Sequence, residues 1–221
     1  MEAKMKHYIY ISDTKVDMLY AQIDKSLLKR FSVDLSIDLK PLGAGVGATI
    51  KQAPLEETRI SKLRLVVRYI EEHQNVGWID APGNYFKGSL PMDWGLALHR
   101  SDVANREAPY AVYFIGKTDR TVVGLVGSVR HLIGNVADAQ GYMLLLYTPH
   151  EILKTLASTT EQLVSLNDDN LRIVVYDMLV RSNLRQQRPL EFLAVNYKFS
   201  EQEPGKLNFL LGSPLYAAFA D

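Results

Sequence analysis

The sequence contains no cysteine among its 221 residues. This absence excludes disulfide bridges, cysteine nucleophiles and cysteine-ligated zinc or iron–sulfur sites. The chain also lacks an apolar run of the ~18 residues that a membrane-spanning helix needs. Its N-terminus passes from a short basic stretch directly into an alternating apolar segment, without the apolar core of a secretory signal. We therefore expect a cytoplasmic protein that does not enter a membrane.

Neither sign of charge is in excess. Lysine and arginine together number 25, and aspartate and glutamate also number 25. A chain without net charge creates no global field that attracts nucleic acid or an anionic membrane. The hydrophobic fraction is 47%, which is typical of a soluble globular protein and sufficient for a core at this length. We expect an ordered protein that does not bind nucleic acid.

Recognised catalytic, metal-binding and phosphate-binding motifs are missing as well. Neither G-x-x-x-x-G-K-[ST] nor G-x-S-x-G occurs, and the five histidines show no H-E-x-x-H spacing. Residues 43–48 read G-A-G-V-G-A, but the extended sequence after them ends at Pro54, where a dinucleotide-binding motif requires a helix. We interpret this run as a flexible hairpin loop, and we predict no metal and no cofactor.

The apolar patterns predict strands and helices in an irregular order. Strands are expected over residues 7–12, 31–40, 110–116, 121–129, 141–148, 189–199 and 206–220, and helices over 13–23, 54–73, 150–166 and 168–183. Strands outnumber helices and do not alternate regularly with them. We therefore expect a single α+β domain over residues 1–221, with a mostly antiparallel or mixed sheet and three to four helices packed against it.

The most distinctive segment is the middle of the chain, residues 77–141, which holds both tryptophans and nine of the 14 glycines. Glycine within apolar sequence marks turns, bulges or places where another backbone or a ligand approaches closely. Residues 85–88 (Y-F-K-G) and 92–95 (M-D-W-G) each combine an aromatic side chain, a charge and a glycine. This combination suits a recognition loop, because tryptophan and tyrosine are good interface anchors. The alternative is a loop that packs its own aromatic side chains onto the sheet.

Acidic residues near the N-terminus form a second candidate site. Asp13 and Asp17 lie at positions i and i+4, with Lys15 between them, so a helix would place both carboxylates on one face. Such a face suits a metal or a cationic ligand, and the alternative is a helix cap next to a solvated face.

His131 follows Ser128 by three residues, and in a strand those two side chains point to opposite faces, which disfavours a nucleophile–base pair.

Several segments, taken in order, resemble one uncharacterised bacterial family that is common in actinomycetes. They are Y-I-Y-I-S-D-T-K-V-D-M-L, P-x-E-E-T-R-x-x-K-L, Y-F-K-G-S-L-P-M-D-W-G, V-Y-F-I-G-K-T-D-R-T-V-V-G-L-V-G-S-V-R-H-L-I-G and L-L-G-S-P-L-Y-A-A-F-A-D. The resemblance covers nearly the whole chain but brings no catalytic residues. It implies a setting beside the caspase-like peptidases and repeat proteins of bacterial conflict or antiphage systems. Lacking a Cys–His dyad and a P-loop, this chain would act there as a sensor, adaptor or regulator.

The first functional hypothesis is a cytoplasmic binding or regulatory module. Its recognition set is Tyr85, Lys87, Asp93 and Trp94, with His131 nearby, in loops over residues 77–99 and 124–135. The partner is a protein or a small-molecule ligand.

The second hypothesis is an enzyme with a non-standard hydrolase or nucleotide-processing site. It would use Asp13, Lys15, Asp17 and His131, brought together from distant segments. A homo-oligomeric scaffold is the third hypothesis.

Overall fold

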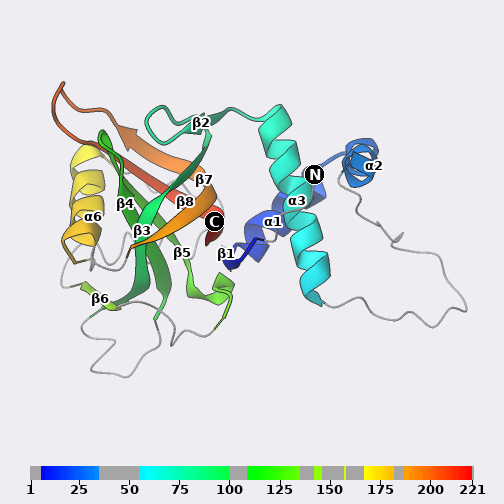
Figure 1. The fold of residues 1–221 in the computed structure, drawn as a ribbon, viewed down its shortest axis with the longest axis horizontal. Helices are drawn as coiled ribbons and strands as arrows, with labels where there is room; N and C mark the ends of the chain where they lie inside the picture. The colour runs from blue at the N-terminus through cyan, green and yellow to red at the C-terminus, as the bar shows by residue number, and fades with distance from the viewer. Residues whose placement is uncertain are drawn as a thin grey trace, which may run out of the picture. The chain divides into compact units, whose positions relative to one another are not determined.

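The computed structural model describes residues 6–34, 55–99, 109–134, 142–145, 157, 167–181 and 187–220. The chain divides into two compact units, one from residues 13–74 and the other from residues 1–12 together with 75–221. Figure 1 labels their helices and strands. Each unit is described by itself below.

The smaller unit contains helices α1 (Asp13–Gln22), α2 (Lys25–Asp34) and α3 (Leu55–His73). Helices α1 and α3 agree with the sequence prediction. The strand predicted over residues 31–40 is wrong where the structure describes it, because residues 31–34 form the last turn of α2. Asp24 explains this result, since its carboxylate accepts hydrogen bonds from the Ser26 amide at 2.7 Å and the Ser26 hydroxyl at 2.6 Å. This cap starts a helix before the alternating pattern begins.

The larger unit is built around five strands that close into a small barrel. These strands are β3 (Tyr85–His99), β4 (Ala111–Lys117), β5 (Thr121–Ser128), β7 (Arg188–Ser200) and β8 (Asn208–Phe219). The pairs β3–β4, β4–β5, β7–β8 and β3–β7 are antiparallel, and β5–β8 is parallel. Strand β3 closes the ring because residues 85–92 pair with β7 and residues 92–97 pair with β4. This connectivity is that of the five-stranded Greek-key barrel of the OB-fold.

Shorter elements extend the barrel. Strand β1 (Tyr8–Ile11) pairs with β8, while β2 (Val76–Trp78) and β6 (Tyr142–Leu145) pair with opposite ends of β3. Helix α6 (Asp168–Arg181) contacts β4, β5 and β8, and Figure 1 shows it alongside β4. The α+β class with a mixed sheet is thus confirmed, as are the strands predicted over residues 110–116 and 121–129, which pair as an antiparallel hairpin. The predicted loop at 43–48 and most of the predicted helix at 150–166 lie outside the described residues.

Two apolar clusters stabilise the larger unit. The first fills the barrel with side chains from alternate strand positions, joined by Ile9 and Tyr10 from β1 and by Ile79 from the segment after β2. The second joins the outer face of β4 and β5 to α6, whose inner face carries Leu171, Val174, Val175 and Met178. The barrel wall therefore has core on both of its faces under α6.

Three glycines make room for large side chains in the barrel. A Cβ atom on Gly88, Gly127 or Gly212 would lie closer than 3.0 Å to Ile79, Tyr10 or Phe86 respectively, which real Cβ contacts essentially never show. The glycine-rich middle of the chain predicted close approach by a backbone or a ligand. At Gly88 and Gly127 the approaching group is instead another side chain of the same barrel.

We predict that Gly88→Ala destabilises the protein by about 1–3 kcal/mol, because the added methyl group overpacks the core. Ile79→Val removes Cδ1, the atom nearest to the new methyl group. Urea unfolding of both single variants and the double variant measures the coupling between the two positions. The double variant should lose less stability than the sum of the single losses, and strict additivity would contradict this packing account.

The expectation of a single domain stays a prediction. Both tryptophans belong to the barrel unit, whereas three of the four described α-helices belong to residues 13–74. Tryptophan fluorescence and far-UV circular dichroism therefore report mainly on different units. If the chain unfolds as one domain, the two signals will share one urea midpoint. Two separated midpoints would show that the units unfold independently.

Candidate functional site

Residues 85–99 form strand β3 instead of the predicted recognition loop. Alternation along this strand places some of the predicted residues inside the barrel and others on its outer face. Phe86, Leu90, Met92, Trp94 and Leu96 all belong to the barrel interior. Side chains of a strand alternate between its two faces, so Tyr85, Lys87 and Asp93 lie on the outer face.

Trp94 is part of the barrel core. Its side chain is only 5% exposed and stacks on Phe114, with ring centroids 6.3 Å apart. The indole Nε1 has no hydrogen-bond partner within the described part of the chain. A side chain enclosed in this way is unavailable as a surface anchor.

Asp93 is also buried, although it lies on the outer face of β3. It is 3% exposed and lies near Tyr113 of the neighbouring strand β4. The pKa of the Tyr113 hydroxyl is raised above its usual range, mainly because the hydroxyl is buried and in second place because the Asp93 carboxylate is nearby. Asp93 is therefore a buried acidic side chain next to the α6-covered cluster and does not lie at the surface.

The exposed tryptophan is Trp78, which the sequence analysis did not select. Its side chain is 62% exposed at the end of β2. Trp78 and Ala81 exchange two backbone hydrogen bonds, at 3.2 and 3.0 Å, and so form a tight hairpin around Ile79 and Asp80. The sequence carried a signal for this hairpin, because W-I-D-A-P-G places the turn-forming residues Asp80, Pro82 and Gly83 within five residues of the tryptophan.

Both residues at the tip of this hairpin attach it to the barrel. Ile79 is 6% exposed and belongs to the barrel core. The Asp80 carboxylate accepts hydrogen bonds from the Thr118 hydroxyl at 3.1 Å and the Thr121 hydroxyl at 2.6 Å. Gly77 supports the same geometry, since a Cβ atom there would collide with the Ala81 carbonyl oxygen. The backbone under Trp78 is therefore held from several sides.

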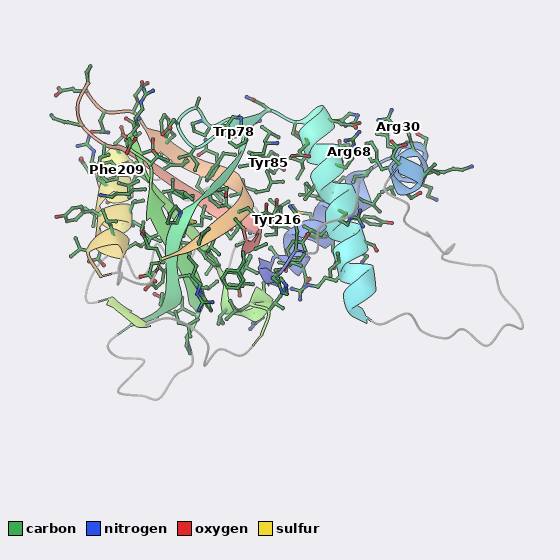
Figure 2. The ribbon with its side chains drawn as sticks, in the orientation of Figure 1. Arg30, Arg68, Trp78, Tyr85, Phe209 and Tyr216 are labelled. Atoms are coloured by element: carbon green, nitrogen blue, oxygen red, sulfur yellow. The ribbon has the colours of Figure 1, made fainter. Side chains whose placement is uncertain are left out.

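Trp78 and three neighbouring side chains form a surface that we call the Trp78 platform, which consists of Val76, Trp78, Tyr85 and Lys87. Val76 lies opposite Tyr85 and Trp78 lies opposite Lys87 in the parallel β2–β3 pair, so all four share one face. The Lys87 ammonium lies 5.4 Å from the centroid of the Trp78 ring, a cation–π contact. Figure 2 labels Trp78 and Tyr85 on these neighbouring strands. Two of the predicted residues, Tyr85 and Lys87, thus flank the exposed tryptophan.

The carboxylates of α1 are paired with cations of α3. Asp13 forms an ion pair with Arg59, and Asp17 forms one with Lys62 at 2.7 Å. Lys15 is buried, and this burial lowers its pKa to about 8. Within the described residues, no group of three or more His, Cys, Asp or Glu side chains could hold a metal ion. Asp13 and Asp17 thus contribute to helix packing in the smaller unit.

His131 lies in the larger unit, in the short 3₁₀ helix η1 (Val129–His131) after β5. Its ring meets the edge of the Tyr10 ring at a centroid distance of 6.1 Å. Ser128 caps η1 by accepting a hydrogen bond from the Arg130 amide at 3.4 Å. Ser128 therefore caps a turn, and His131 lies in η1 instead of the strand that the sequence argument assumed.

A shallow polar hollow lies between the β4–β5 turn and the β7–β8 turn. It measures about 330 Å³ and is lined by Asp119, Arg120 and residues 201–208. Its charged side chains are of both signs, so it favours neither an anion nor a cation.

None of the described helices is long and apolar enough to cross a bilayer.

We predict opposite behaviour for the two tryptophans. Trp94→Ala should cost about 3–5 kcal/mol of stability because it empties a core position, whereas Trp78→Ala should cost less than about 1 kcal/mol. Acrylamide should strongly quench the fluorescence of the Trp94→Phe variant, in which the exposed Trp78 remains. It should only weakly quench that of the Trp78→Phe variant, in which the buried Trp94 remains. The reverse order in either measurement would contradict the assignment of Trp78 to the surface.

Comparison with known proteins adds a family but no chemistry. No curated protein and no solved structure matches the chain. One family model matches residues 6–221, which is nearly the full length. This match agrees with the resemblance to an uncharacterised family found in the sequence. The chain belongs to the family of unknown function DUF7019.

Proposed function

We propose that this protein is a non-catalytic binding module that contacts a protein partner through the Trp78 platform. One observation carries the proposal: Trp78 is 62% exposed on a hairpin that the barrel core and Asp80 hold in place. Tryptophan is enriched among the few residues that dominate protein–protein binding energy. Because the hairpin is already ordered, binding pays little conformational entropy there.

Nucleic acid is the less suitable partner, although the strand connectivity matches that of the OB-fold. An OB-fold binds oligonucleotides on the face formed by its second and third strands, which correspond here to β4 and β5. Helix α6 covers the outer face of these two strands with Leu171, Val174, Val175 and Met178. The Trp78 platform holds a single cation, Lys87, which is a weak basis for phosphate binding.

The enzymatic alternative has less support. Asp13 and Asp17 each form an ion pair with a cation of α3, as expected for carboxylates with a structural role.

The resemblance seen in the sequence suggests a finer version of the binding proposal: a sensor or adaptor in the cytoplasm, acting in a bacterial conflict system. We retain that setting as part of the proposal.

Site-specific photo-crosslinking in the source cells tests the proposed function. A photoreactive phenylalanine analogue is placed at Trp78 and, as a matched control, at Tyr176 of α6, which is 59% exposed. We expect one protein adduct from position 78 that does not form from position 176, with Lys87→Glu reducing its yield. The absence of an adduct at position 78, or the same adducts from both positions, would contradict the proposal.

A further inference from the structure

We propose that Asp80 is a positioning residue of the Trp78 platform, whose hydrogen bonds fix the direction in which Trp78 faces its partner. This inference rests on the proposed function and deepens it by separating two roles within the hairpin. Ile79 attaches the hairpin to the barrel, and Asp80 sets its orientation. The orientation set by Asp80 is separable from the stability of the fold.

The position of Trp78 follows that of the hairpin tip. Both backbone groups of Trp78 are bonded to Ala81, so the tip holds the two residues together. The tip has two anchors, because Ile79 enters the barrel core and Asp80 reaches the β4–β5 turn. Apolar burial such as that of Ile79 is non-directional, whereas hydrogen bonds have a preferred geometry. Asp80 is therefore the contact that fixes the orientation of the tip.

The β4–β5 turn is a preformed support for Asp80. Its backbone is closed by a hydrogen bond from the Thr118 amide to the Thr121 carbonyl at 2.9 Å. The Thr118 hydroxyl also accepts hydrogen bonds from the amides of Arg120 at 3.1 Å and Thr121 at 2.9 Å. Because its two lone pairs are used in this way, its proton is directed to the Asp80 carboxylate. Such support from residues behind a binding surface is what holds a binding side chain in a fixed geometry.

Burial separates the effect of Asp80 on orientation from its effect on stability. Asp80 itself is exposed, but it accepts a hydrogen bond from the hydroxyl of Thr121, which is fully buried. Removing the carboxylate takes the acceptor from a buried donor and lowers stability, whereas making both partners apolar is nearly neutral. Thr121→Val should therefore restore the stability that Asp80→Ala loses, without restoring the orientation of the hairpin.

Nitrogen-15 relaxation of the Trp78 indole in the full-length protein tests the inference without a partner, and the Trp94 indole is the internal control. In Asp80→Ala we expect the Trp78 order parameter to fall towards ~0.6, the value of flexible groups, while that of Trp94 stays unchanged. Asp80→Asn keeps an acceptor oxygen and should retain most of the order. Asp119→Ala is the matched control and should change neither indole. It removes a carboxylate of the same turn that makes no hydrogen bond to the hairpin within the described residues.

The double variant Asp80→Ala/Thr121→Val distinguishes a positioning role from structural support. We expect its urea midpoint to return to the wild-type value while the Trp78 indole stays mobile. The yield of the crosslink from position 78 should stay at least about threefold lower, because a smaller fraction of the molecules presents the hairpin correctly. Recovery of the indole order together with the midpoint would overturn the inference, and so would an unchanged Trp78 order parameter in Asp80→Ala.

The crosslink separates failure of this inference from failure of the proposed function. If position 78 captures a specific protein but neither the yield nor the indole order responds to Asp80→Ala, the module stands and the positioning role is wrong. If position 78 captures no protein in the wild-type background, both proposals fall.

Discussion

The limited interior of a five-stranded barrel is the constraint on which the rest of the structure depends. Such a barrel has room for few large side chains, and here it must also take in Tyr10 from β1 and Ile79 from the hairpin after β2. Gly127 and Gly88 leave the space that these two side chains occupy. Because of this space, Tyr10 can anchor β1 and Ile79 can anchor the hairpin in the barrel core. A methyl group at either position would act on packing and on attachment together.

The surface follows from this packing. With Ile79 inserted in the core and Asp80 bonded to Thr118 and Thr121, the strand alternation leaves Trp78 outside. Lys87 and Tyr85 join it because the β2–β3 register places them opposite Trp78 and Val76. Exposing Trp78 in this way costs the protein little stability, because the hairpin is anchored through Ile79 and Asp80 and not through Trp78 itself. The binding proposal rests on this separation between anchoring and exposed residues.

Much of the fold was predictable because local periodicity sets it. The hairpin of β4 and β5, the closing strands and helices α1, α3 and α6 agree with patterns in the sequence. The candidate site was less predictable. Whether Trp78 or Trp94 lies outside depends on which face of its strand meets the barrel interior, and contacts between residues far apart in the sequence decide that, such as those of Asp80 with Thr118 and Thr121. The same composition argument selected all four residues, but the register places Tyr85 and Lys87 beside the exposed Trp78, whereas Asp93 and Trp94 are buried.

The central claim is that Trp78 is presented to solvent on a backbone that is already rigid. Nitrogen-15 relaxation of the uniformly labelled protein, read at the amides of residues 77–81 and at the two indole N–H groups, tests it most directly. The account predicts backbone order parameters near ~0.85, as in rigid elements, with a solvent-exchanging indole at Trp78 and a protected one at Trp94. Order parameters below ~0.6 over these residues, or a protected Trp78 indole, would contradict it.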